Sequence, residues 1–84
     1  RNPAGRGAGG EGIDLGKEYR ELLEAYDRAG LPFERVLTRL GYGRWLQTVA
    51  ELEQARSIVG GALEICRRFG MSILEKDCLE MRRQ

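Results

Sequence analysis

The most distinctive chemistry in this 84-residue sequence belongs to two cysteines, Cys66 and Cys78. Two thiols can form a disulfide, act as a redox couple, or supply two of the four ligands of a zinc site. The sequence contains no histidine, so two cysteines alone cannot complete a tetrahedral zinc site within one chain. Both stand at apolar positions of a helical pattern, which favours reduced, inert core residues. A single Cys66–Cys78 disulfide across a helical hairpin is the alternative.

The sequence also lacks the residues that most enzymes need. Without histidine it has neither the commonest general base nor the usual partner of a nucleophilic Ser or Cys. Gly60-Gly61 lacks the preceding strand and the following Lys-Ser/Thr of a phosphate-binding loop. Five acidic residues recur at three and four positions, which indicates the solvated face of a helix and not a calcium loop: Asp14, Glu18, Glu21, Glu24 and Asp27. We therefore predict a non-enzymatic protein with no metal and no cofactor.

Residues 33–48, FERVLTRLGYGRWLQT, are compatible with a helix-turn-helix whose turn is centred on glycine. Arg and Gln side chains recognise guanine and adenine through paired hydrogen bonds, and further arginines contact phosphates. The candidate nucleic-acid-binding residues are Arg35, Arg39, Arg44, Gln47 and Thr48. The net charge of only +1 and the bulky Trp45 count against this interpretation. Two bundle helices joined by a glycine turn are the simpler alternative.

A long apolar stripe beginning near Arg44 suggests a second kind of site. Its apolar residues recur every three or four positions and cover more than a third of a helix circumference. Exposed stripes of this kind on small helical domains mark protein interfaces, where arginines such as Arg56, Arg67 and Arg68 orient the partner at the rim. The candidate interface residues are Trp45, Val49, Leu52, Arg56, Val59 and Leu63. The alternative is that the whole stripe is core, because so small a domain has a thin core.

These residues must be positioned by helices, because no segment shows the alternation typical of strands. The apolar spacing predicts helices at about 15–29, 32–40, 44–69 and 73–81. At Gly60-Gly61 we expect a kink or break of the third helix; the alternative is that another helix approaches its backbone closely there. Asp14 is the expected N-cap of the first helix, Gly30 its C-terminal residue, and Pro32 the first residue of the second. Ser72 and Glu75 form a predicted capping box. The predicted fold class is all-α, a compact bundle of four or five short helices.

The chain divides into two parts by composition. Residues 1–12 hold five of the twelve glycines and predict a disordered, flexible Gly/Arg-rich arm or linker, followed by a single helical domain at residues 13–84. No apolar run is long enough to span a membrane, and the cysteine content favours an intracellular setting. We expect a helical protein-interaction or oligomerisation module of a larger protein, binding another protein chain or itself through an apolar helix face. The alternative is a nucleic-acid-binding domain.

Overall fold

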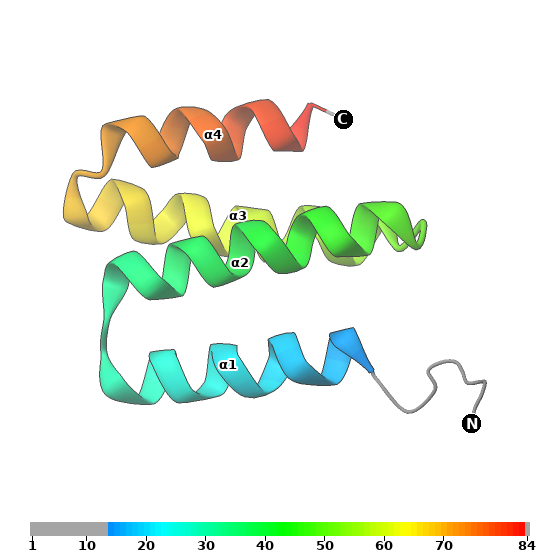
Figure 1. Ribbon diagram of the computed structural model, residues 1–84. Helices are drawn as coiled ribbons and strands as arrows, with labels where there is room; N and C mark the ends of the chain where they lie inside the picture. The colour runs from blue at the N-terminus through cyan, green and yellow to red at the C-terminus, as the bar shows by residue number, and fades with distance from the viewer. Residues whose placement is uncertain (1–13, 84) are drawn as a thin grey trace, which may run out of the picture.

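The computed structural model describes residues 14–83 and is an all-α bundle, which confirms the predicted fold class. Its helices are α1 (Leu15–Ala29), α2 (Pro32–Thr48), α3 (Leu52–Phe69) and α4 (Ser72–Arg82). Turns of two or three residues join them, so successive helices run antiparallel (Figure 1). The flexible arm predicted at residues 1–12 lies outside the described residues.

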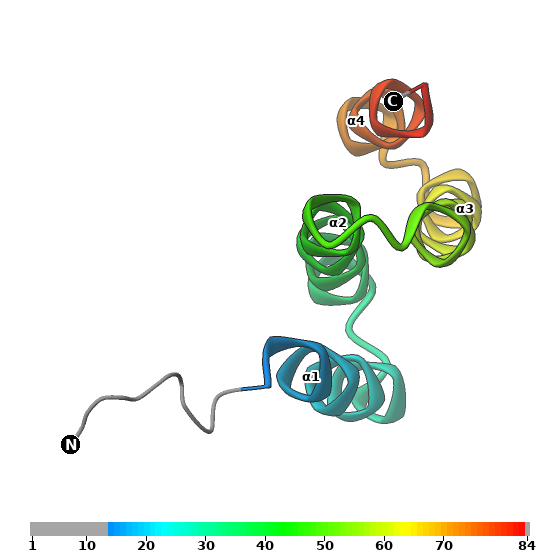
Figure 2. The ribbon, with the colours of Figure 1, turned by 90° about the vertical axis from the view of Figure 1, so that its right-hand side faces the viewer.

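The helices pack mainly against their neighbours in sequence. Within the described chain, α1 packs only against α2, whereas α3 packs against both α2 and α4. Viewed end-on, α2, α3 and α4 form a triangle, and α1 extends from α2 on the side away from α4 (Figure 2). One side of α3 therefore faces away from every other helix.

The boundaries of α1 follow the capping signals in the sequence. The Asp14 carboxylate accepts a hydrogen bond from the Lys17 backbone N–H at 3.2 Å, which confirms it as the N-cap. Gly30 ends the helix in the left-handed conformation, with φ 70°, and its N–H donates to carbonyls of the last turn. Pro32 lies in the first turn of α2, as predicted.

The predicted end of the second helix at Leu40 is wrong. Helix α2 continues through Gly41 and Gly43 to Thr48, so no turn separates its two halves. A Cβ atom built on Gly43 would lie 2.6 Å from Cγ2 of Val59, because α2 crosses α3 closely at this point. Tyr42, between the two glycines, is fully buried. These glycines therefore serve helix packing instead of a reversal of the chain.

The chain reverses at Val49–Glu51 instead, and the predicted break at Gly60-Gly61 is also wrong. Helix α3 is continuous through both glycines. The turn is made by Ala50, whose φ of 64° is unusual for a residue with a side chain. Hydrogen bonds from the Ala50 and Glu51 N–H groups to carbonyls of the last turn of α2 hold it closed. Neither Gly nor Pro marks this turn, so its sequence carries no standard signal.

Helix α4 begins at Ser72, without the predicted capping box. Its N-cap is Met71, and no side chain caps the helix start. The Glu75 carboxylate instead accepts a hydrogen bond from Arg67 Nε on α3, at 3.2 Å. Gly70 ends α3 with φ 71°, as the sequence indicates.

The buried side chains form two clusters that meet along α2 and α3. The larger joins α2, α3 and α4: Val36, Leu40, Val59, Ala62, Leu63, Ile65, Cys66, Cys78 and Met81. The smaller joins α1 to the start of α3: Leu23, Tyr42, Leu46 and Ala55, with Tyr19, Trp45 and Ile58 packed against it. Both clusters depend on the close crossing of α2 and α3.

The strained turn generates the first prediction. A residue with a Cβ is less stable in the left-handed conformation by about 1–2 kcal/mol, and replacing it with glycine removes this cost. The greater entropy of glycine in the unfolded chain offsets part of the resulting gain in stability. Ala50→Gly should therefore raise the free energy of unfolding by about 0.5–1 kcal/mol. Urea unfolding followed by circular dichroism measures the change. The matched control, Ala25→Gly at an exposed mid-helix position of α1, should lower it by about 1 kcal/mol. Equal destabilisation by both substitutions would contradict the prediction.

Candidate interaction surface

Trp45, the first of the predicted interface residues, belongs to the packing of α1 on α2. Its ring lies 6.2 Å from that of Tyr42 and 6.3 Å from that of Tyr19, measured between centroids. A Cβ on Gly16 would lie 3.1 Å from the indole, so α1 approaches α2 closely over this ring. The indole is half-buried by these contacts. The main role of Trp45 is therefore to pack α1 against α2.

The other predicted interface residues divide between core and surface. Val59 and Leu63 are buried among α2, α3 and α4 and cannot touch a partner in this fold. Val49, Leu52 and Arg56 are exposed at and after the α2–α3 turn. The predicted stripe spans this turn, so the structure does not bring the six residues together on one surface.

Two of the candidate nucleic-acid-binding residues hold α1 against α2. Arg35 Nε donates to Asp27 Oδ1 at 2.8 Å, and Arg39 donates to both carboxylate oxygens at 3.1 and 2.9 Å. The hydrogen bonds from Arg39, joined by Arg35, hold the pKa of Asp27 below its usual 3.8 against a smaller opposing effect of burial. These guanidinium groups already have an anionic partner.

The remaining candidate residues do not form a recognition surface with them. Gln47 Nε2 donates to the Met81 carbonyl at 3.2 Å, and the Thr48 hydroxyl donates to the Trp45 carbonyl at 2.6 Å. Arg44 is exposed, but it follows Arg35 by nine residues and so lies on the opposite side of α2. Because α2 is one helix, the predicted helix-turn-helix at residues 33–48 is wrong: the reversal that would present a recognition helix is absent.

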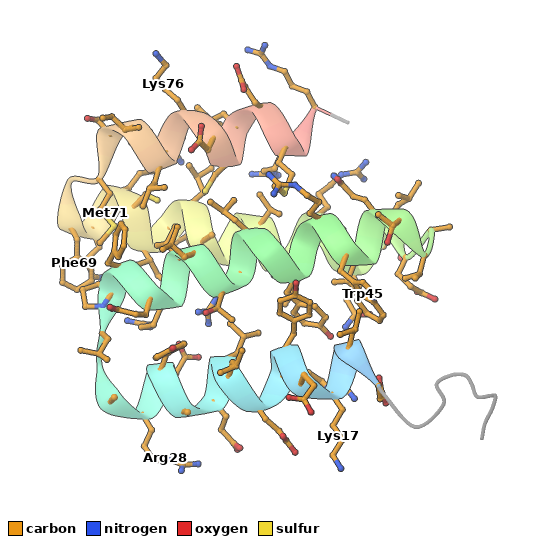
Figure 3. The ribbon with its side chains drawn as sticks, in the orientation of Figure 1. Lys17, Arg28, Trp45, Phe69, Met71 and Lys76 are labelled. Atoms are coloured by element: carbon orange, nitrogen blue, oxygen red, sulfur yellow. The ribbon has the colours of Figure 1, made fainter. Side chains whose placement is uncertain are left out.

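Large apolar side chains gather instead at the end of the bundle that carries the α1–α2 and α3–α4 turns. We call this group the end cluster, and it comprises Phe33, Phe69, Met71, Ile73 and Leu74. Phe33, Phe69 and Ile73 are 52%, 50% and 77% exposed. Figure 3 shows Phe69 and Met71 at this end, opposite Trp45. Exposure of three such side chains on one small end is a concentrated apolar patch.

A shallow hollow of about 330 Å³ at this end is lined by four members of the end cluster, Phe33, Met71, Ile73 and Leu74, together with Gly70 and Ser72. A second hollow, of about 160 Å³, lies beside it along α2 and α3 and is lined by Phe69, Ile65, Glu64, Arg35 and Arg68. Arg35 is engaged by Asp27, whereas Arg68 is exposed. The second hollow therefore combines the apolar Phe69 with an exposed cation, Arg68, and an exposed carboxylate, Glu64.

Sequence reasoning missed the end cluster because its members belong to three separate helix ends. Phe33 opens α2, Phe69 closes α3, and Ile73 lies in the first turn of α4. Each has an apolar position in its own helix, and only the antiparallel turns bring them to one end. The sequence does contain one signal for this cluster. Phe69 directly precedes Gly70 and Phe33 directly follows Pro32, so both large apolar residues stand at helix ends, where packing in the core is not required.

Cys66 and Cys78 meet in the core between α3 and α4. Their sulfur atoms are 4.0 Å apart, and both thiols are free and fully buried. Desolvation by burial raises the pKa of Cys66, and it raises the pKa of Cys78 to about 12. This environment suppresses the thiolate that redox and nucleophilic chemistry require.

No helix within residues 14–83 has the length and hydrophobicity needed to cross a bilayer. The same residues contain no cluster of three or more His, Cys, Asp or Glu side chains that could hold a metal ion. Comparison of the chain with protein-family models, curated proteins and solved structures gives no significant match. The geometry of this chain is therefore the basis for assigning a function.

The Asp27 ion cluster generates a pH prediction. Because the pKa of Asp27 is lowered on folding, its contribution to stability is fully present above the usual value of 3.8 that it has in the unfolded chain. That contribution is lost as pH falls through the folded-state value. Asp27→Asn should lower the free energy of unfolding at neutral pH, and the difference from wild type should begin to shrink below about pH 4 and close below the folded-state pKa. Urea unfolding from neutral pH to below about pH 4 measures the difference in free energy of unfolding between variant and wild type. Glu21→Gln, which removes an exposed carboxylate of α1, is the control. A stability difference between Asp27→Asn and wild type that does not change with pH would show that the charge of Asp27 is not its cause.

The buried thiol pair generates a reactivity prediction. With Cys78 near a pKa of about 12 and both sulfurs inaccessible, alkylation by iodoacetamide at pH 8 should be limited by unfolding of the domain. Labelling followed by mass spectrometry should be slow in buffer and complete in concentrated urea. Rapid labelling of the folded protein would contradict the assignment of both cysteines as inert core residues.

Proposed function

We propose that this chain is a non-enzymatic helical protein-interaction module that binds another polypeptide through the end cluster. The observation that carries the proposal is the exposure, by half or more, of Phe33, Phe69 and Ile73 at one end of the bundle, where Phe33 and Ile73 line one apolar hollow and Phe69 lines a second hollow. Apolar side chains of this size stabilise a complex by about 1.5–3 kcal/mol each when fully buried, so an exposed group of three is a strong contact point.

The proposed partner is an amphipathic segment that combines apolar and acidic side chains. A hollow of about 330 Å³ has room for one or two large apolar side chains but not for a domain-sized contact. Arg68, beside the neighbouring hollow, is placed to contact a carboxylate of the same segment. The surface therefore favours short-segment recognition, in which a few anchor residues provide most of the affinity.

The test is selection of binding peptides from a displayed library, followed by amide NMR titration of the whole chain with the winning peptide. We expect enriched sequences to alternate apolar and acidic residues, and shifts to centre on Phe33 and on residues 69–74. Ile73→Asp should weaken binding by about tenfold or more, because a charge would be placed in the apolar contact.

The matched control is Val49→Asp, which places the same charge at the other end of the bundle. It should leave peptide binding unchanged. Binding that is lost with Val49→Asp but kept with Ile73→Asp would move the interaction to the α2–α3 turn and overturn the proposal. The proposal would also be overturned if Ile73→Asp weakened the binding of none of the selected peptides.

A further inference from the structure

The side of α3 that faces away from the other helices has a chemistry different from that of the end cluster. We define the α3 outer face as Glu53, Arg56, Ser57, Gly60, Glu64 and Arg67. Apart from the half-buried Gly60, these residues are exposed, and they follow one another at helical spacing along a single stripe. A shallow surface hollow of about 740 Å³ runs along it, and Gly61, Leu63 and Arg82 of α4 complete its lining. Figure 2 shows that one side of α3 is not covered by the other described helices.

Gly60, at the centre of this face, has no packing contact with another helix among residues 14–83. A Cβ atom built on Gly60 would have nothing within 4 Å, whereas one on Gly43 or Gly61 would meet a neighbouring side chain. Glycine in a helix interior lowers stability by about 1 kcal/mol relative to alanine. Gly60 therefore lowers the stability of the helix without allowing a closer contact inside the domain. This suggests a contact with another molecule, because glycine permits another backbone to approach closely.

The charges on either side of Gly60 are arranged in complementary pairs. Four residues before and after it, about one helical turn, are Arg56 and Glu64. Seven residues before and after it, about two turns, are Glu53 and Arg67. Each equidistant pair therefore combines opposite charges.

This pattern matches a second copy of the same helix in one orientation. When two α3 helices cross antiparallel with their Gly60 residues together, equidistant positions face each other. Arg56 then faces Glu64 of the second copy, and Glu53 faces Arg67. A parallel arrangement would place each charge against itself, so the pattern selects the antiparallel one.

We propose that the chain forms a symmetric dimer in which the α3 outer faces of two copies pack antiparallel across a two-fold axis at Gly60. Such an interface is isologous, so each ion pair occurs twice. Arg67 is held in position by its contact with Glu75 at 3.2 Å and is still 59% exposed. The apolar side chains of the end cluster are not part of this face, so the dimer does not depend on the function proposed above; Glu64 lines both this face and the hollow beside Phe69.

The first test is analytical ultracentrifugation of the whole chain from about 10 µM to about 1 mM. One helix per copy makes a small interface, so we expect a reversible monomer–dimer equilibrium and not a permanent dimer. Ionic attraction across the interface should make association weaker in about 1 M salt than in about 0.05 M salt. A chain that is monomeric at every concentration in both salts overturns the proposal.

The second test exchanges the charges of one pair. Arg56→Glu alone should weaken dimerisation by about tenfold or more, because two attractive contacts become repulsive. Glu64→Arg alone should do the same, while the double variant Arg56→Glu/Glu64→Arg should restore association to within about threefold of wild type. Glu21→Arg, the same charge change on exposed α1, should have no effect.

The third test uses Gly60 itself. Gly60→Ala should raise the thermal midpoint of the isolated monomer, because nothing lies near the added methyl group, and should weaken the dimer. Gly60→Leu should abolish dimerisation while the helical circular dichroism spectrum is kept. A dimer that survives Gly60→Leu, or that is lost with Ile73→Asp alone, would place self-association elsewhere and overturn the proposal without affecting peptide binding at the end cluster.

Discussion

The close crossing of α2 and α3 is the constraint on which the rest of the structure depends. It requires a residue without a side chain at Gly43, because the methyl groups of Val59 occupy the space where a Cβ would lie. Once the two helices meet there, Val36 and Leu40 join Ala62 and Leu63 in the larger cluster, and Tyr42 and Leu46 join Ala55 in the smaller one. Helix α4 then closes the larger cluster through Cys78 and Met81.

Helix α1 is attached by a different set of interactions. It buries few apolar side chains, with Leu23 as the main one, and it touches only α2 within the described chain. Aromatic contacts from Tyr19 to Tyr42 and Trp45 hold one end, and the Asp27 carboxylate with its two arginines holds the other. These contacts are polar or half-exposed, so the α1–α2 seam is more sensitive to pH and salt than the core.

The division of apolar residues between inside and outside determines which functions the chain can support. The triangle of α2, α3 and α4 uses Val59 and Leu63 as core, so the apolar stripe of α3 is not a free surface. Two surfaces of contrasting chemistry remain. The end cluster is apolar, with the exposed Arg68 beside Phe69, whereas the α3 outer face carries charges of both signs.

The local signals in the sequence determined the helical class, the boundaries of α1, the start of α2 and the end of α3, because Asp14, Gly30, Pro32 and Gly70 act within one turn of their own position. The same reasoning misplaced the reversal, since glycine favours both turns and close helix contacts, and only the identity of the facing residue separates the two. Gly43 faces Val59, so α2 continues, and Ala50 makes the turn without any marker. Tertiary structure alone decided the surfaces, because Phe33, Phe69 and Ile73 meet only when the antiparallel helices bring three separate helix ends together.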